Sequence, residues 1–193
     1  MAVRRLAPPD MQPKEFAFTA DNLAWAKQQM AKYPEGRQQS TVILLLWRAQ
    51  EQSGGWLPQK AIEHVAAMLG MAKIRVLEVA TFYTMFNLEP VGEHLVQVCT
   101  TTPCWLRGSD AVMKACEAAA DGETFSVQEV ECLGACVNAP VVQINDDFYE
   151  DLDEASMKRL LEAFRRGETP KPGPRVDRQT SAPVGGPTTL RRE

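Results

Sequence analysis

The 193-residue sequence has few aromatic residues and no long hydrophobic run. Phe, Trp and Tyr together make up 7% of the chain, and the longest strongly apolar run covers residues 41–47. A helix that spans a bilayer needs about 20 apolar residues, so we expect no membrane span. Arg4 and Arg5 are followed by no apolar segment, which argues against a secretory signal. We therefore expect a cytoplasmic protein.

Excess positive charge is also missing. The formal net charge is -4 at pH 7, and Lys and Arg form no stripe. A nucleic-acid binder needs a basic face that neutralises phosphates, so we expect no nucleic-acid partner. No Gly-x-Gly-x-x-Gly follows a predicted strand, and no Walker lysine loop occurs. If NADH, flavin or ATP is used, we expect another chain to bind it.

Cysteine is sparse, but its few copies are clustered. The chain has five cysteines. Four of them form two close pairs, Cys99 with Cys104 and Cys132 with Cys136. In a reducing compartment, clustered thiols more often hold a metal or carry out redox chemistry than form structural disulfides. The pattern therefore indicates a metal or redox site.

The first half of the chain is predicted to be helical. Residues 19–86 contain four segments in which apolar residues recur at intervals of three and four, as on one face of a helix. Thr19 is predicted to cap the first helix and Ser40 the second, and the third is predicted to end at Gly70. We expect residues 1–90 to form a helical bundle.

The pattern changes after Pro90 to short β-type runs. Ser109 is predicted to cap one helix, and another helix is predicted to begin at Asp153. The order is β-α-β followed by β-β-α, which is typical of a thioredoxin-type sheet. We therefore expect an α+β fold, with a mixed four-stranded sheet in residues 91–167. The four strands are predicted at residues 94–99, 125–132, 141–144 and 147–152.

Residues 168–193, the C-terminal arm, are rich in proline and glycine and show no periodicity. Such a composition predicts no packed element. We expect a loose tail or a docking arm.

The two cysteine pairs match the ligand set of a binuclear iron–sulfur cluster. In a [2Fe-2S] cluster each iron has two bridging sulfides and two thiolates, so the ligands come as two pairs. Gly134 lets the backbone wrap closely around sulfur, and N–H groups of residues 100–102 can donate to it. Trp105 is expected to shield one side from water. The candidate ligands are Cys99, Cys104, Cys132 and Cys136.

Spacing alone leaves two alternatives open. A structural zinc site also takes four cysteines, although zinc knuckles usually have two residues between cysteines where these pairs have four and three. A thiol oxidoreductase would use a Cys-x-x-Cys at a helix start, and none occurs. We rank the cluster first, zinc second and thiol redox chemistry third.

The fifth cysteine and both histidines are predicted to lie outside the site. Cys116 falls on the apolar face of a predicted helix, as a small core residue would. His64 and His94 are isolated, whereas a Rieske centre needs paired histidines near its cysteines.

Several short stretches resemble one family. They read YPEGR, GWLP, EVATFYTMF, PVG, VCTTTPC, VECLGACVNAP, QIND, YEDL and PKPGPR, and they lie between Phe16 and Leu190. With them the chain is similar to the 24 kDa subunit family of respiratory complex I, the NADH:quinone oxidoreductase. The resemblance implies an N-terminal helical bundle followed by a thioredoxin-like [2Fe-2S] ferredoxin domain.

The resemblance also implies a function. The cluster, called N1a, would be held by the four candidate cysteines and would exchange single electrons with FMN. FMN and NADH would sit on a partner flavoprotein subunit, and a larger iron–sulfur subunit of the peripheral arm would be a second partner. The chain itself would carry no catalytic residue. The complex would lie on the cytoplasmic face of a bacterial inner membrane, or on the matrix side in an organelle.

Two other hypotheses stay open. Related [2Fe-2S] subunits of NAD-dependent formate dehydrogenases and bidirectional hydrogenases share the four cysteines. A structural zinc adaptor would belong to a different class. Two departures from the family are visible, a short segment between the cysteine pairs and Pro187 after Gly185-Gly186.

Overall fold

The computed structural model describes residues 4–186 and residue 189. The chain divides into two compact units between Val91 and Gly92. Pro187 lies outside the described residues. Within the described part, no helix is both long enough and apolar enough to cross a bilayer.

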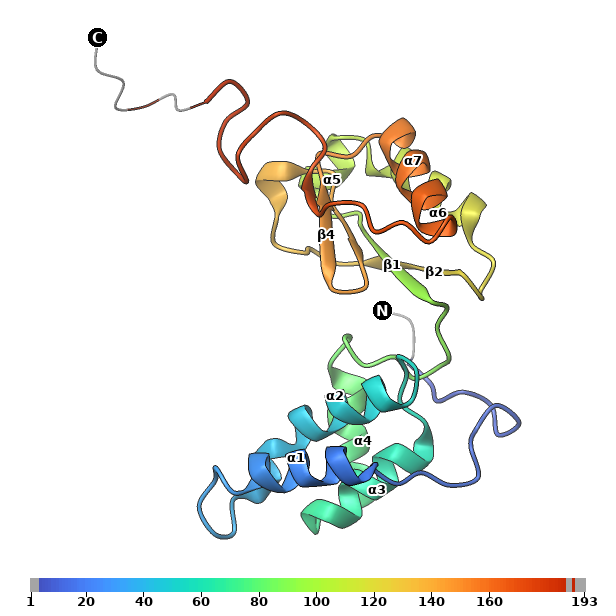
Figure 1. Ribbon diagram of the computed structural model, residues 1–193, viewed down its shortest axis with the longest axis vertical. Coiled ribbons are helices and arrows are strands. Elements are labelled where there is room, and N and C mark those ends of the chain that lie inside the picture. The colour runs from blue at the N-terminus through green and yellow to red at the C-terminus, as the bar shows by residue number, and fades with distance from the viewer. Residues whose placement is uncertain (1–3, 187–188, 190–193) are drawn as a thin grey trace. The chain divides into compact units, whose positions relative to one another are not determined.

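Over its described residues, the first unit is built from four α-helices and one short 3₁₀-helix (Figure 1). They are α1 (Ala20–Met30), the 3₁₀-helix η1 (Gln38–Thr41), α2 (Val42–Gln52), α3 (Gln59–Leu69) and α4 (Lys73–Phe82). The apolar stripes of these helices meet in one core, whose fully buried members include Leu45, Leu46, Ile62, Val65 and Val76. The four helices predicted from the periodicity are confirmed.

Two of the three predicted helix ends in this unit are confirmed. Thr19 Oγ1 accepts the Asn22 N–H at 3.3 Å, and Gly70 ends α3 in the left-handed conformation with φ 61°. The prediction for Ser40 is wrong, because Ser40 lies inside η1. The Thr41 hydroxyl at the start of α2 donates instead to Gln38 O at 2.5 Å. The 3₁₀ turn thus replaces a side-chain cap.

The second unit contains, among its described residues, a mixed five-stranded sheet. Its strands are β1 (His94–Cys99), β2 (Phe125–Val130), β3 (Val142–Ile144), β4 (Asp147–Glu150) and β5 (Gly173–Pro174). The order is β2-β1-β3-β4-β5. β1 and β2 run parallel, as do β4 and β5, while β3 pairs antiparallel with both β1 and β4. The predicted mixed sheet is confirmed, with one strand more than expected.

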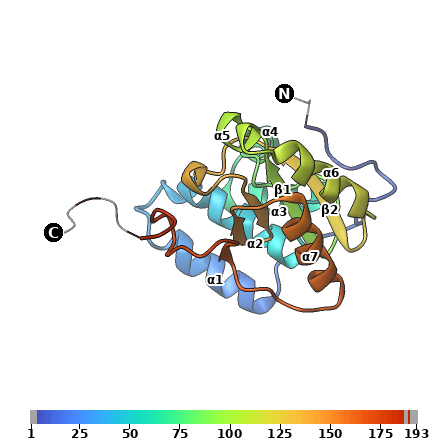
Figure 2. The same ribbon diagram turned by 90° about the horizontal axis from the view of Figure 1, so that it is seen from above.

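Two helices cover one face of this sheet. α6 (Ser109–Ala119) and α7 (Glu154–Arg165) lie side by side (Figures 1 and 2). The strands alternate, so that Val96 and Val98 point into the core while Gln97 between them is half-buried. Val112 and Cys116 from α6 and Met157 from α7 are fully buried against them, and a second core forms.

The ends of these two helices differ in how well they were predicted. Asp153 caps α7 as expected, and its carboxylate accepts the Ser156 N–H at 2.7 Å while Ser156 Oγ accepts the Asp153 N–H at 2.9 Å. The prediction for Ser109 is wrong. Gly108, with φ 94°, precedes the helix, and Ser109 lies inside it, fully buried.

The C-terminal arm corrects a third prediction, that residues 168–193 form no packed element. β5 adds to the edge of the sheet, where the Arg175 N–H donates to Glu150 O at 2.9 Å. The Tyr149 hydroxyl donates to Pro170 O at 3.1 Å. A strand of two residues leaves no periodic signal, but the free backbone groups of an edge strand can still pair with it.

Candidate metal centre

Two connections at one end of the sheet carry the candidate ligands. Cys99 is the last residue of β1, and Cys104 lies in the short helix α5 (Thr102–Leu106) that follows it. Cys132 and Cys136 lie in the connection from β2 to β3, where Cys136 begins the 3₁₀-helix η2 (Cys136–Asn138). β1 and β2 are parallel neighbours, so the connections that follow them leave the same edge of the sheet.

The structure brings the four sulfurs together as two pairs. Cys132 Sγ and Cys136 Sγ are 3.3 Å apart, and the side chains of Cys99 and Cys104 are hydrogen-bonded to each other. Thr101 lies between the pairs, since its hydroxyl is 3.3 Å from Cys99 Sγ and also contacts Cys132. Over the described residues, no three His, Cys, Asp or Glu side chains surround a single point as one metal ion requires. The donor set there is two pairs.

The pairs differ in exposure. Cys99 is 2% exposed and Cys104 is 1% exposed, whereas Cys132 and Cys136 are both exposed. The buried pair packs against Ala139, Val141, Leu133, Ala135 and Phe148. Trp105, which the sequence suggested as a shield, is 57% exposed. The apolar cover of the buried pair therefore comes from the residues around β3, and Trp105 is not among them.

Backbone N–H groups point at the sulfurs. The Gly134 N–H donates to Cys132 Sγ at 3.4 Å, and Gly134 has a φ of 82°, which a side chain would disfavour. The N–H groups of Thr101 and Leu133 donate to Cys99. Donors of this kind favour thiolates over thiols, and thiolates are the metal-binding form. The expected donation from residues 100–102 is thus found at Thr101.

These surroundings set the acidity of each thiol. Burial raises the pKa of Cys104 to about 12, and the neighbouring Cys99 side chain adds to this shift. Burial also opposes ionisation of Cys99, but hydrogen bonds from Thr101 and Leu133 outweigh it and lower the pKa of that thiol. The Gly134 N–H, aided by the Cys136 thiol, lowers the pKa of Cys132. The Cys132 side chain raises the pKa of Cys136. Each pair therefore contains one thiol whose pKa is lowered and one whose pKa is raised.

The donor set fits a binuclear cluster. Such a cluster takes two thiolates at each iron and is stabilised by N–H groups donated to sulfur. Both features are present at the four cysteines. Small residues at the site, Gly134 among them, let backbone come close to sulfur.

The fifth cysteine and the histidines lie elsewhere. Cys116 is fully buried in the core between α6 and the sheet, which confirms its predicted role. Burial raises the pKa of Cys116 to about 12. His64 packs edge-on against Phe16 and Phe18 in the first unit. His94 begins β1, at the opposite end of the strand from Cys99.

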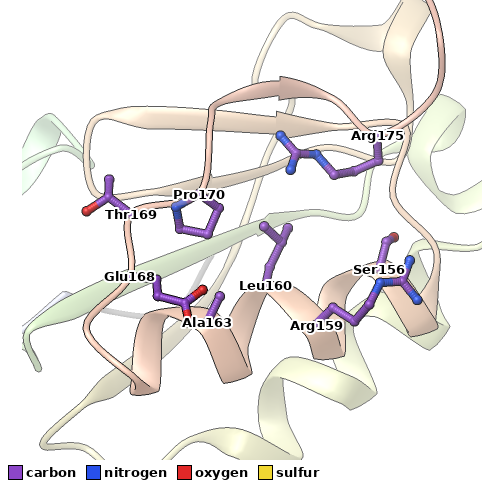
Figure 3. Close-up of a pocket in the computed structure, with 8 residues that line it drawn as sticks. All are labelled: Ser156, Arg159, Leu160, Ala163, Glu168, Thr169, Pro170 and Arg175. Atoms are coloured by element: carbon purple, nitrogen blue, oxygen red, sulfur yellow. The ribbon is translucent and has the colours of Figure 1, made fainter.

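A separate hollow in the second unit contains none of the cysteines. Its volume is ≈ 250 Å³, and it lies between α7 and the C-terminal arm (Figure 3). Leu160 and Arg159 of α7 face Pro170 and Arg175 of the arm across it. The hollow is therefore not part of the cysteine site.

The functional groups that sequence reasoning missed are the Thr101 hydroxyl and the Leu133 N–H. Thr101 lies between Cys99 and Cys104 in the sequence, so a polar residue inside the pair was a usable signal. The Leu133 N–H donates from the connection that carries the other pair, and only the folded chain reveals that contact.

Comparison with known proteins gives consistent results. The family model of thioredoxin-like [2Fe-2S] ferredoxins matches residues 26–165. The chain is 54% identical to an NADH-quinone oxidoreductase subunit of Rhizobium meliloti (strain 1021), over 98% of this chain and 73% of that protein. It is 57% identical to the NADH-quinone oxidoreductase subunit of the same type from Rickettsia prowazekii (strain Madrid E), over 77% of this chain and 89% of that protein.

A solved structure has a similar fold. The NAD+-reducing [NiFe]-hydrogenase in the H2-reduced state aligns with a TM-score of 0.53 and 21% identity. The alignment covers 63% of this chain and 22% of the hydrogenase chain, so it concerns the fold alone. The family model covers more than half of the sequence, and the relatives match over most of their length. The chain therefore belongs to the thioredoxin-like [2Fe-2S] ferredoxin family.

Proposed function

We propose that the chain is the electron-transfer subunit of an NADH:quinone oxidoreductase, respiratory complex I, and that it carries a [2Fe-2S] cluster. The relatives at 54% and 57% identity both bear the name of the same NADH-quinone oxidoreductase subunit. The single observation that carries the proposal is the meeting of two cysteine pairs at one end of a thioredoxin-like sheet. The chain is part of an oxidoreductase and binds no NADH itself.

The ligands are Cys99 and Cys104 for one iron and Cys132 and Cys136 for the other. The 3.3 Å between Cys132 Sγ and Cys136 Sγ and the hydrogen bond between Cys99 and Cys104 support this pairing. The Thr101 hydroxyl beside both pairs supports a single site rather than two. The same four cysteines are the ones whose spacing in the sequence predicts a binuclear cluster.

The residues of the chain prepare the site for one-electron chemistry. When bound, a [2Fe-2S] cluster supplies a centre that accepts and returns one electron at a time. The N–H groups of Thr101, Leu133 and Gly134 stabilise negative charge on sulfur. The apolar residues around β3 keep water from the buried pair, while the exposed pair faces outward.

The partner for this outward face is a flavoprotein subunit that binds FMN and NADH, and the cluster is the one called N1a. Exposed apolar side chains beside the cysteines support a protein partner here. Trp105 is 57% exposed, Leu106 is 71% exposed and Val137 is 69% exposed. Exposed apolar residues gathered around a site are typical of a protein interface. A larger iron–sulfur subunit of the peripheral arm is the second partner.

The assembly is located on the cytoplasmic face of a bacterial inner membrane, or on the matrix side of an organellar one. The chain is peripheral there, and other subunits anchor the complex. The relatives from two bacterial genera support the first location.

Affinity purification of the native assembly tests the host complex. A tagged chain should recover an FMN-containing subunit that oxidises NADH and passes electrons to a quinone. Recovery of a nickel–iron or formate-oxidising subunit instead would move the chain to a hydrogenase or a formate dehydrogenase. Recovery with zinc and without iron would support an adaptor role.

A further inference from the structure

The C-terminal arm returns to the connection that carries Cys132 and Cys136. β5 fixes the arm on the edge of the sheet, and the Arg175 guanidinium lies 5.4 Å from the centre of the Tyr149 ring. Between α7 and this strand the arm passes over the hollow of ≈ 250 Å³ (Figure 3). The arm is thus held at specific contacts rather than along its whole length.

One of these contacts is made by Asn138, which ends η2 two residues after Cys136 and is 1% exposed. Its Nδ2 donates to Glu150 Oε2 at 2.5 Å and to the backbone oxygen of Thr180 at 3.0 Å. Its own backbone oxygen accepts the Asp151 N–H at 2.7 Å. A single buried side chain therefore joins the cysteine connection to the end of β4 and to the arm.

A buried ion pair lies beside Asn138. Arg178 of the arm pairs with Asp151, and the two side chains are only 9% and 3% exposed. The same guanidinium donates from Nη1 to Asn138 Oδ1 at 3.5 Å. The arm thus contacts Asn138 twice, through a backbone oxygen and through an arginine.

This ion pair is incompletely hydrogen-bonded, so a contribution to stability alone does not explain it. Arg178 Nε and Asp151 Oδ2 are buried without a hydrogen-bond partner among the described residues. The cost of removing both charges from water is therefore only partly offset. The pair does restrict the relative positions of Arg178, Asp151 and Asn138, because a planar guanidinium between two acceptors allows few arrangements.

We propose that Arg178 and Asp151 are positioning residues that hold the connection carrying Cys132 and Cys136, through Asn138, in the conformation that binds the cluster. The inference rests on the proposed function, since it takes Cys132 and Cys136 as ligands. The other pair needs no such support, because Cys99 and Cys104 are buried against the sheet. The connection that carries the exposed pair is held by the contacts of the C-terminal arm with Asn138.

The test compares full-length variants that contain the cluster. R178Q removes the ion pair, and R178K restores the charge but not the planar fork. The double variant R178Q/D151N leaves no buried unpaired charge, so it keeps the test decisive if R178Q folds poorly. R166Q is the matched control, because it breaks an arginine pair with Glu168 at 2.7 Å in which both side chains are exposed.

The measurements are the rate of cluster loss to a chelator, the EPR spectrum of the reduced protein and the far-UV unfolding midpoint. R178Q and the double variant should lose the cluster roughly tenfold faster than R166Q, with a shifted EPR spectrum and a folded chain. R178K should recover part of the difference. A double variant with the cluster lifetime and EPR spectrum of the unmodified chain would overturn the proposal.

Failure of the proposed function can be told apart from failure of this inference. If the unmodified chain binds no iron–sulfur cluster, the proposed function is wrong. In that case amide hydrogen exchange at residues 132–138 tests the inference, because Arg178 and Asp151 are proposed to hold this connection whether or not a cluster is bound. Faster exchange in R178Q than in R166Q would support the positioning role of Arg178, and equal exchange would reject it.

Discussion

At the scale of single residues, the two cysteine pairs lie at the same end of the sheet but depend on different parts of the protein. Cys99 and Cys104 are nearly fully buried, and a charged sulfur there needs N–H donors from the surrounding backbone. Cys132 and Cys136 are exposed and depend on the shape of their connection. The chemistry of the four thiols should therefore differ.

Alkylation of the cluster-free protein should reveal this difference. Iodoacetamide near neutral pH should modify Cys132 first, because this thiol is exposed and the Gly134 N–H lowers its pKa. Cys104 and Cys116 should react last, since burial raises the pKa of each to about 12. Mass spectrometry of peptides at successive times gives the order. Early labelling of Cys104 would contradict the geometry of the site.

Alanine variants should distinguish a cysteine that binds the cluster from a cysteine of the core. C132A should lose most of its iron and sulfide and still fold, because Cys132 is exposed. C116A should keep the cluster, and its thermal midpoint should fall by roughly 2–6 °C, since a small cavity in a core costs about 1–2 kcal/mol. Metal analysis and circular dichroism measure both effects. Equal cluster loss in the two variants would reject the assignment of ligands.

The pairing of the cysteines could be predicted from the sequence, but their surroundings could not. Spacing and strand ends point to four thiols in two pairs. In the structure the members of each pair are in contact, and the role of the four as ligands stays a prediction. The exposure of Trp105 could not be predicted, because it depends on where α5 lies after β1. Neither could the Asn138 contacts, which join residues far apart in the sequence.

At the scale of elements, a carboxylate organises the connection from α6 to β2. Asp121 Oδ1 accepts the N–H groups of Glu123 at 3.1 Å, Thr124 at 2.7 Å and Phe125 at 3.0 Å. These bonds, the one from Phe125 first, lower the pKa of Asp121 from 3.8 to about 2. One side chain thus fixes the point at which β2 begins.

The D121N variant should reveal this effect through its pH dependence. The pKa of Asp121 is lower in the folded chain than in the unfolded one, so its contribution is full above pH 3.8 and is lost as the pH falls through about 2. D121N should therefore have a lower thermal midpoint than the unmodified chain at pH 7, and the gap should close toward pH 2. D146N, at the exposed β3–β4 turn, is the control. A difference in thermal midpoint that does not change with pH would contradict this role of the Asp121 carboxylate.

Element types were easier to predict than element ends. Stripes of several turns specify α1 to α4, α6 and α7, because burial requires a continuous apolar face. α5 spans five residues and β5 spans two, and such lengths are too short for a period to repeat in the sequence. Ser40 and Ser109 looked like caps, but a 3₁₀ turn and Gly108 occupy those helix starts. Several local solutions satisfy a helix end equally well, so composition alone does not select one.

At the scale of the whole molecule, the C-terminal arm has two parts. Residues 170–180 contact the sheet and Asn138. We propose that the part beyond residue 180 docks on the flavoprotein subunit. The first part thus belongs to the ferredoxin unit, and the docking role is proposed for the second part alone.

Deletion of residues 181–193 should test this division. The shortened chain should keep its cluster and its unfolding midpoint, because Arg178 and Thr180 are retained. Its affinity for the flavoprotein subunit should fall roughly tenfold, which corresponds to about 1.4 kcal/mol of binding energy. A pull-down titration measures it. Unchanged affinity would reject a docking role for this part of the arm.

The order of elements along the whole chain was predictable because it follows from periodicity. Four helices precede a β-α-β and β-β-α arrangement, and the structure has both. The fifth strand was not predictable, since it joins Gly173 and Pro174 to an edge that only the folded sheet presents. Long-range pairing of this kind leaves no trace in local composition.

The central claim is that four cysteines from two connections of this sheet hold one binuclear cluster. The most direct measurement is iron and acid-labile sulfide content together with EPR of the reduced chain after anaerobic purification. We predict about two iron and about two sulfide per chain, with the signal of a one-electron-reduced [2Fe-2S] centre. A colourless chain that contains one zinc ion and no sulfide would contradict it.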